Sequence, residues 1–174
     1  MAVSQFNLND GQRAERKLLI TVAEWTVGTS TEREILGTRT EDSSIDYNPD
    51  IETTTDILGK NYTDMNRTQP QQDFDPYLVL GGSKLGALLN DIRRRNALSE
   101  LNQFTVYIIT AFTGTAGAYE AEKHANCTIA YNSIGGDTNV NFPISVYFSN
   151  DITTGTVDKL ADDFVFTADA TIGG

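Results

Sequence analysis

The stretch FTVYIITAF at residues 104–112 decides the fold, because it has the pattern of a strand that is buried on both faces. Successive side chains of a strand point to opposite faces, so Phe104, Val106 and Ile108 share one face. Tyr107 and Ile109 place apolar groups on the other face as well. A strand with two apolar faces is covered on both sides. We therefore expect residues 104–112 to form a central strand.

A single helix is expected just before this strand, at residues 83–97. Ser83 follows two glycines and is a favourable N-cap. An apolar stripe at helical spacing follows, made of Leu85, Leu88, Leu89 and Ile92. The stripe should pack on a sheet. Arginines at 93–95 end the helix, where cations complement the helix dipole, and we interpret them as a helix end that can also pair with acids of another subunit.

The rest of the chain has mostly strand patterns, separated by turns rich in Gly, Asn and Asp. The strands that we expect span residues 17–27, 127–134, 140–148 and 163–168, with weaker candidates at 35–40 and 45–47. Neither an internal repeat of 20–50 residues nor a linker divides the chain. Residues 1–174 are therefore interpreted as one mainly β domain with one helix.

Two polar segments lie outside this pattern. Residues 1–16 resemble an arm that becomes ordered on contact with another surface. Residues 41–75 hold nine acids and two bases, with one alternating strand at 51–57 and an otherwise loop-like composition. Long loops in compact domains are usually functional or disordered. A mobile surface loop and a loop ordered by a neighbouring copy are both compatible with this segment.

Composition limits the kind of partner. The chain has a net charge of -11, and a negative field repels phosphate backbones and anionic lipid surfaces. Its one cysteine, Cys127, cannot form an internal disulfide, so synthesis in the cytoplasm is expected. No signal-peptide core and no apolar run of about 20 residues is present in the sequence, so we expect no membrane anchor.

No arrangement of residues in the sequence supports catalysis, and we expect no enzyme. The only histidine, His124, forms an H-x-x-C pair with Cys127, which supplies two of the four ligands that a structural zinc site needs. Asp73 and Asp75 precede Pro76 in a segment typical of a turn. No phosphate-binding loop, nucleophile elbow or EF-hand spacing occurs. We predict no catalytic residue, no cofactor and no bound metal.

The segment NYTDMNRTQPQQDFDPYLVLGGSKLGALLNDIRRRNAL at 61–98 resembles the major tail tube proteins of bacteriophages, which share their fold with the type VI secretion tube protein. The shared pattern is T-D-x-N-x-T-x-P-x-Q-x-F-D-P followed by GG-x-K-L. It is matched here by Thr63, Asp64, Asn66, Thr68, Pro70, Gln72, Phe74, Asp75, Pro76, Gly81, Gly82, Lys84 and Leu85. The wider resemblance covers about residues 17–168.

This resemblance implies two packed antiparallel sheets, sandwich-like or barrel-like, with a flanking helix. It also implies six subunits per ring, and rings that stack into a hollow conduit for DNA ejection. Partners would be other copies of the chain, a tape measure protein during assembly, a tail terminator, distal tail or baseplate proteins, and double-stranded DNA in passage. The protein would be made in the host cytoplasm and reside in the virion tail. We expect segments 1–16 and 41–75 to contact neighbouring rings.

An acidic lumen would let DNA slide without adhering, because like charges repel. On the expected strand 51–57, Glu52 and Asp56 share one face, while Ile51 and Ile57 would point to the core. Glu52 and Asp56 are thus lumen candidates, with Glu24 a weaker one. Two alternatives stay open: the inner tube of a contractile phage-tail-like injection machine, and a free-standing β-sandwich binding module.

Overall fold

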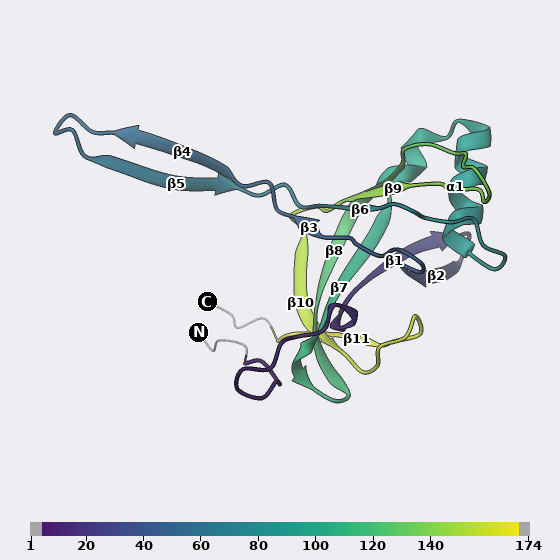
Figure 1. Cartoon of the computed structure of the whole chain (residues 1–174), viewed down its shortest axis with the longest axis horizontal. Coiled ribbons are helices and arrows are strands. Elements are labelled where there is room, and N and C mark those ends of the chain that lie inside the picture. The colour runs from purple at the N-terminus through teal and green to yellow at the C-terminus, as the bar shows by residue number, and fades with distance from the viewer. Residues whose placement is uncertain (1–4, 171–174) are drawn as a thin grey trace.

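The computed structural model describes residues 5–170, and within them the chain forms a bent antiparallel β structure with one flanking α-helix (Figure 1). The strands are β1 (Leu19–Val27), β2 (Ser30–Ile35), β3 (Ile45–Asp46), β4 (Asp50–Thr55), β5 (Asn61–Arg67), β6 (Gln71–Phe74), β7 (Phe104–Thr115), β8 (Ala118–Tyr131), β9 (Ile144–Tyr147), β10 (Ile152–Val157) and β11 (Phe166–Ala168). The helix is α1 (Lys84–Arg95), and η1 (Arg16–Leu18) and η2 (Leu98–Asn102) are short 3-10 turns.

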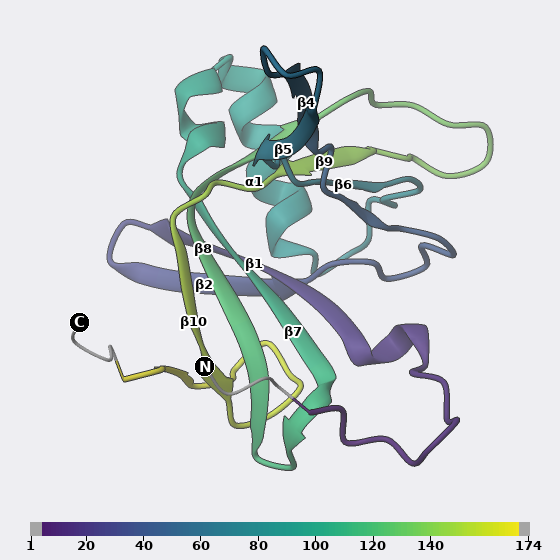
Figure 2. The same ribbon diagram turned by 90° about the vertical axis from the view of Figure 1, so that its left-hand side faces the viewer.

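Nine of these strands belong to one continuous sheet that folds into two layers. Its order is β2-β1-β7-β8-β9-β6-β3, with β10 and β11 joined to the outer side of β8. Figure 2 shows β7, β8 and β10 side by side, with α1 above them. Strands β4 and β5 pair only with each other. The expected mainly β fold, two packed antiparallel layers with a flanking helix, is confirmed.

Strand β8 connects the two layers. Its first part, from Tyr119 to His124, pairs with β10, and its last part, from Thr128 to Tyr131, pairs with β9. Between them Asn126 adopts a left-handed conformation with φ of 56°. Asparagine tolerates this conformation better than most residues. The strand therefore changes its partner, and the sheet bends, at this residue.

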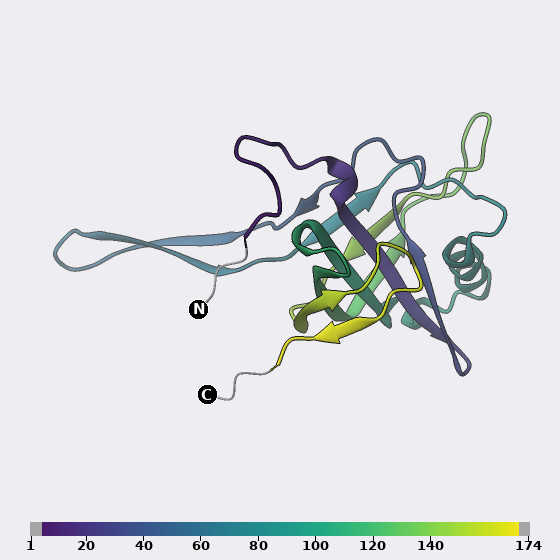
Figure 3. The same cartoon turned by 90° about the horizontal axis from the view of Figure 1, so that it is seen from below.

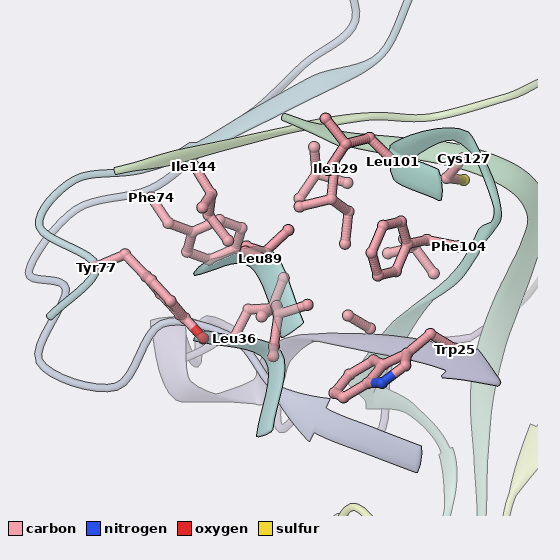
Figure 4. Packing of buried hydrophobic residues seen from close by; sticks show 14 of the residues in the cluster. Trp25, Leu36, Phe74, Tyr77, Leu89, Leu101, Phe104, Cys127, Ile129 and Ile144 are labelled. Atoms are coloured by element: carbon pink, nitrogen blue, oxygen red, sulfur yellow. The ribbon is translucent and has the colours of Figure 1, made fainter. Parts of the chain in front are cut away.

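The main core fills the space between the layers and the helix (Figure 4). It contains Trp25 of β1, Phe104 of β7, Ile129 of β8 and Ile144 of β9, and all are buried. Leu85, Leu89 and Ile92 of α1 contribute the helix side of the core, and Leu88 packs at its margin. A second cluster lies on the opposite face of β1 and β7, and consists of Val22, Tyr107, Ile109, Ala121, Val157 and Phe164.

These two clusters explain the two apolar faces of β7. The strand is paired on both sides, with β1 and with β8. Phe104, Val106 and Ile108 enter the main core, while Tyr107 and Ile109 enter the second cluster. The prediction of a central strand at residues 104–112 is confirmed.

Helix α1 begins where the sequence predicts. The Ser83 hydroxyl accepts a hydrogen bond from the Gly86 N–H at 3.0 Å, as an N-cap does. Asn96 ends the helix in a left-handed conformation, one residue before the expected boundary at 97. Strand β2 provides a second hydrogen-bond acceptor at the start of the helix, because Glu34 accepts hydrogen bonds from the hydroxyls of Ser83 and Tyr77.

Some strand predictions were wrong. Residues 35–40 are not a strand, because β2 ends at Ile35, and Gly37 and Arg39 adopt positive φ of 99° and 64°. Strands β2, β5, β6 and β10 were not predicted. Strand β10 has the sequence ITTGTV, whose few apolar residues give no strong pattern, and its pairing with β8 and β11 holds it in place.

Candidate assembly surfaces

The most prominent surface feature is a two-stranded hairpin that projects from the body of the molecule (Figure 1). We call residues 50–67, comprising β4, β5 and their connection, the hairpin arm. Every residue of both strands is exposed. An isolated two-stranded hairpin is at best marginally stable in water. Among residues 5–170 no other strand pairs with the arm, so its own strand pairing is the main interaction that holds it extended in the described chain.

The hairpin arm has two chemically different faces. On one face Ile51 lies opposite Met65, and Thr53 lies opposite Thr63, with their hydroxyls 3.2 Å apart. The other face places Glu52 opposite Asp64. Like charges directly opposite on a strand pair are destabilising. One face thus offers exposed apolar and hydroxyl groups, and the other presents two facing carboxylates.

This geometry corrects the prediction for strand 51–57. Its core-facing residues were expected to be buried, yet Ile51 is 58% exposed and Ile57 is fully exposed. The alternation predicted one face turned toward the core, but the strand pairs only with β5 and packs on no other element within residues 5–170. Neither face of the arm is covered by residues 5–170.

The tip of the arm combines a fixed turn with an apolar surface. Asp56 lies just beyond β4, and its Oδ1 accepts hydrogen bonds from the N–H groups of Leu58 and Lys60, each at 2.9 Å. These bonds lower the pKa of the Asp56 carboxyl below its ordinary value. Ile57 and Leu58 stand outward on this turn, and Leu58 is 87% exposed. The tip presents two neighbouring aliphatic side chains to solvent.

The three lumen candidates lie in different settings. Glu52 is on the carboxylate face of the arm and accepts a hydrogen bond from Asn66 at 3.3 Å. Asp56 holds the turn at the tip. Glu24 lies on the body, where it pairs with Arg33 at 2.6 Å and accepts hydrogen bonds from the Tyr107 hydroxyl. The arm thus carries Glu52 on its shaft and Asp56 at its tip, and Glu24 is part of a separate, largely covered ion pair on the body.

A second apolar surface lies at the opposite end of the molecule, beside α1. We call it the loop pocket, and it is a cavity of about 300 Å³. Its rim consists of exposed aliphatic residues from two loops, namely Val79, Leu80, Ile134 and Val140. Phe142 forms part of its lining, and Ala87 and Asn90 contribute the helix side. Figures 1 and 3 both place α1 at one end of the long axis and the hairpin arm at the other.

Backbone pairing holds the two loops of this pocket together. Leu78 forms a bridge with Asn141, and the Val79 N–H donates to the Val140 carbonyl at 3.0 Å. Asn141 also donates to Asp75 at 2.9 Å. The loops are more than 50 residues apart in sequence. No pattern in the sequence therefore indicated this pocket.

The large sheet offers further assembly surfaces at its edges. Its path ends at β2 and β3, and the branch ends at β11. An edge strand presents unpaired backbone groups that can pair with another chain. The apolar strand β7 is internal, because it pairs with β1 on one side and β8 on the other. Among the described strands, β2, β3, β11 and the hairpin arm have edges available for pairing between copies.

The N-terminal arm 1–16 lies partly outside the described residues, which begin at 5. Phe6 is 70% exposed, yet it forms a bridge with Thr113 and contacts the Phe112 ring. The Asn7 N–H donates to the Phe112 carbonyl at 3.0 Å. This part of the arm is thus attached to the end of β7.

His124 and Cys127 serve the fold. The His124 Nδ1 and Nε2 lie 3.1 Å from the Ser149 carbonyl and from Glu122, respectively. Cys127 is buried in the main core, and burial raises the pKa of its thiol.

Over residues 5–170 no group of three metal-ligating side chains converges. In the same range no helix has the length and apolar character needed to cross a bilayer.

No protein-family model matches the sequence, and no curated protein matches it. Among solved structures, the chain is similar to a chain in the cryo-EM structure of the anti-feeding prophage baseplate, determined with six-fold symmetry. That similarity has a TM-score of 0.45 and 8% sequence identity, and covers 84% of this chain and 97% of the other.

Proposed function

We propose that this chain is a structural subunit of a phage tail tube, which stacks as hexameric rings into a conduit for DNA and carries no catalytic activity. The observation that carries the proposal is the hairpin arm. It is a fully exposed strand pair without a covering element among residues 5–170. A subunit that is complete only when a neighbour covers this arm is built for a repeating assembly.

Two further features support this proposal. The body has two antiparallel layers and one flanking helix, which is the architecture that the resemblance of segment 61–98 implies. The arm itself, residues 50–67, overlaps the start of that segment. In this proposal the arm joins successive rings, and the sheet edges join subunits within a ring.

Other components of a tail follow from the same proposal. Terminal rings would bind a tail terminator at one end and distal tail or baseplate proteins at the other. A tape measure protein would occupy the bore during assembly. The carboxylate face formed by Glu52 and Asp64 would contribute to a negative bore, where DNA passes without adhering.

The structure suggests a clean way to test the role of the arm. The Gln69 N–H donates to the Tyr47 carbonyl at 2.8 Å, and β3 pairs with β6 beyond it. The two ends of the arm are therefore already joined on the body. Replacing residues 50–67 with a short Gly-Asn turn should leave the body folded.

Negative-stain microscopy and light scattering would compare the intact chain with this armless variant. The intact chain should form rings and tubes at high concentration, and the armless variant should form no tubes. Circular dichroism and thermal unfolding would verify that the armless body is folded. Tubes formed equally well by both proteins would remove the arm from the mechanism. An intact chain that stays monomeric at every concentration would refute the proposed function.

A further inference from the structure

Two unpartnered apolar features of the described chain, one convex and one concave, lie at opposite ends of it. The tip of the hairpin arm is convex and bears Ile57 and Leu58. The loop pocket is concave and has an aliphatic rim. Its volume of about 300 Å³ is at the small end of the roughly 300–1,000 Å³ range of protein pockets that bury apolar groups. A pocket of this size suits a pair of aliphatic side chains.

The tip cannot reach the pocket of its own chain. In both Figure 1 and Figure 3 the arm extends away from α1, along the longest axis of the molecule. A protrusion at one end and a matching pocket at the other define a heterologous, head-to-tail contact, which repeats from copy to copy. The geometry therefore favours a second copy of this chain as the occupant.

Charge distribution points to the same occupant. The arm contains four carboxylates and two basic side chains. Residues 76–100, which hold α1 and one loop of the pocket, contain four basic and two acidic side chains. Arg93 donates to Asn90 of the pocket wall at 2.9 Å, and neither Arg93 nor Arg94 has an ion pair within residues 5–170. The acidic arm and the basic end of the helix are thus electrostatically matched.

We infer that the hairpin tip of one copy inserts Ile57 and Leu58 into the loop pocket of the next copy, with Arg93 and Arg94 facing the acidic tip, where Asp56 lies. This inference rests on the proposed function and specifies which surfaces of two subunits meet. It predicts that the tip and the pocket are both required for assembly, although neither is needed for the fold of the monomer.

Site-specific cross-linking tests the contact directly. The variant Leu58→Cys/Ala87→Cys places one thiol on the tip and one on the exposed helix wall of the pocket. A short bis-maleimide reagent added under assembling conditions should give a ladder of covalent oligomers. Cys127 is buried and should not react, as the unmodified chain would verify. The matched control Leu58→Cys/Ala116→Cys moves the second thiol to the β7–β8 turn and should give no ladder.

Substitutions provide a second measurement. Ile57→Ser/Leu58→Ser should raise the concentration needed for association at least about tenfold, since two aliphatic side chains would no longer be buried. Ala87→Trp should have a similar effect by filling the pocket. Thr54→Ser, on the arm but away from its tip, should assemble normally. All three variants should unfold at the wild-type temperature, because these side chains are exposed in the monomer.

The outcomes separate this inference from the proposed function. Rings or tubes that form while Leu58→Cys/Ala87→Cys gives no ladder would overturn the tip-and-pocket contact and leave the tube proposal standing. Normal assembly of both Ile57→Ser/Leu58→Ser and Ala87→Trp would overturn it as well. A chain that never associates would overturn the contact and the tube proposal together.

Discussion

The Oε2 atom of Glu34 accepts a hydrogen bond from the Leu85 N–H at 3.0 Å, so that strand β2 caps the first turn of helix α1. The same carboxylate accepts hydrogen bonds from the hydroxyls of Tyr77, at 2.7 Å, and Ser83, at 3.0 Å. Negative charge is favourable at a helix N-terminus. One side chain therefore fixes the helix to the sheet, and with it the helix wall of the loop pocket.

Replacing Glu34 with Ala should destabilise the folded monomer by about 2–4 kcal/mol, because several charge-assisted hydrogen bonds are lost and their donors are left in a partly buried site. Urea denaturation measures this loss. Glu32→Ala is a matched control, since Glu32 pairs with the exposed Lys84 and the substitution should cost much less stability. Equal effects of the two substitutions would contradict the capping role.

Stability should fall at high pH through Tyr107. Burial and the nearby Glu24 carboxylate raise the pKa of this phenol from 10.0 to about 12. The folded state holds the proton more tightly than the unfolded state does. The contribution is thus complete below pH 10 and is lost as the pH rises toward 12. Tyr107→Phe should show a shallower loss of stability over this interval, measured by denaturant unfolding at each pH. Identical slopes for both proteins would exclude Tyr107 as the cause.

Trypsin should cleave the hairpin arm of the dispersed monomer at Lys60 and Arg67, because an exposed two-stranded hairpin opens locally at little cost. Assembly should slow these cuts at least about tenfold, since a covered arm opens less often. Peptide mapping by mass spectrometry would follow each site. Lys123, in the middle of β8, should resist cleavage in both states. Equal cleavage of the arm before and after assembly would mean that no neighbour covers it.

Association should depend on salt and on the charge of Arg94. Arg94→Glu replaces a cation at the end of α1, and should weaken association by repelling the acidic arm of the neighbouring copy. The defect should shrink at high salt, because surface charges are screened. Sedimentation velocity at low and high salt measures both effects. Asp137→Lys offers a charge change of the opposite sign on the exposed 134–141 loop, and should not weaken association.

Glu52→Lys tests whether the carboxylate face of the arm looks into the bore. The substitution removes the repulsion with Asp64 and should leave the arm folded. In virions, each added cation in the bore would contribute a salt-sensitive phosphate contact. DNA ejection should become slower at low salt and recover at moderate salt. Asp42→Lys makes the same charge change on the body and is the control. Unchanged ejection kinetics for Glu52→Lys would place this face outside the bore.

Local patterns predicted the parts of the fold that local physics determines. The apolar stripe of α1 and its Ser83 cap depend on residues only a few positions apart in sequence. The two apolar faces of β7 are visible within nine residues. Strand β10 could not be found this way, because Gly155 and three threonines occupy it. Its glycine is required by packing, since a Cβ there would lie 2.3 Å from the Thr167 carbonyl oxygen.

The assembly surfaces were predicted only in part. The alternation at residues 51–57 correctly indicated a strand, but alternation does not tell whether a strand joins a sheet or stands apart. The structure confirms that Glu52 lies on an acidic face of this strand. The prediction that Ile57 is buried was wrong. The loop pocket depends on contacts between residues 78–82 and 134–142, which are distant in sequence. Such a surface becomes visible only once the chain is folded.

The bend of β8 at Asn126 has a mechanical consequence. Because one strand belongs to both layers, a pull on the hairpin arm passes through the segments that join it to β3 and β6, and then across the ladders of backbone hydrogen bonds between β6 and β9, β9 and β8, and β8 and β7. Strands loaded along their length resist sliding through many bonds at once. In the proposed tube, these ladders would carry axial tension across the joint between the two layers of each subunit.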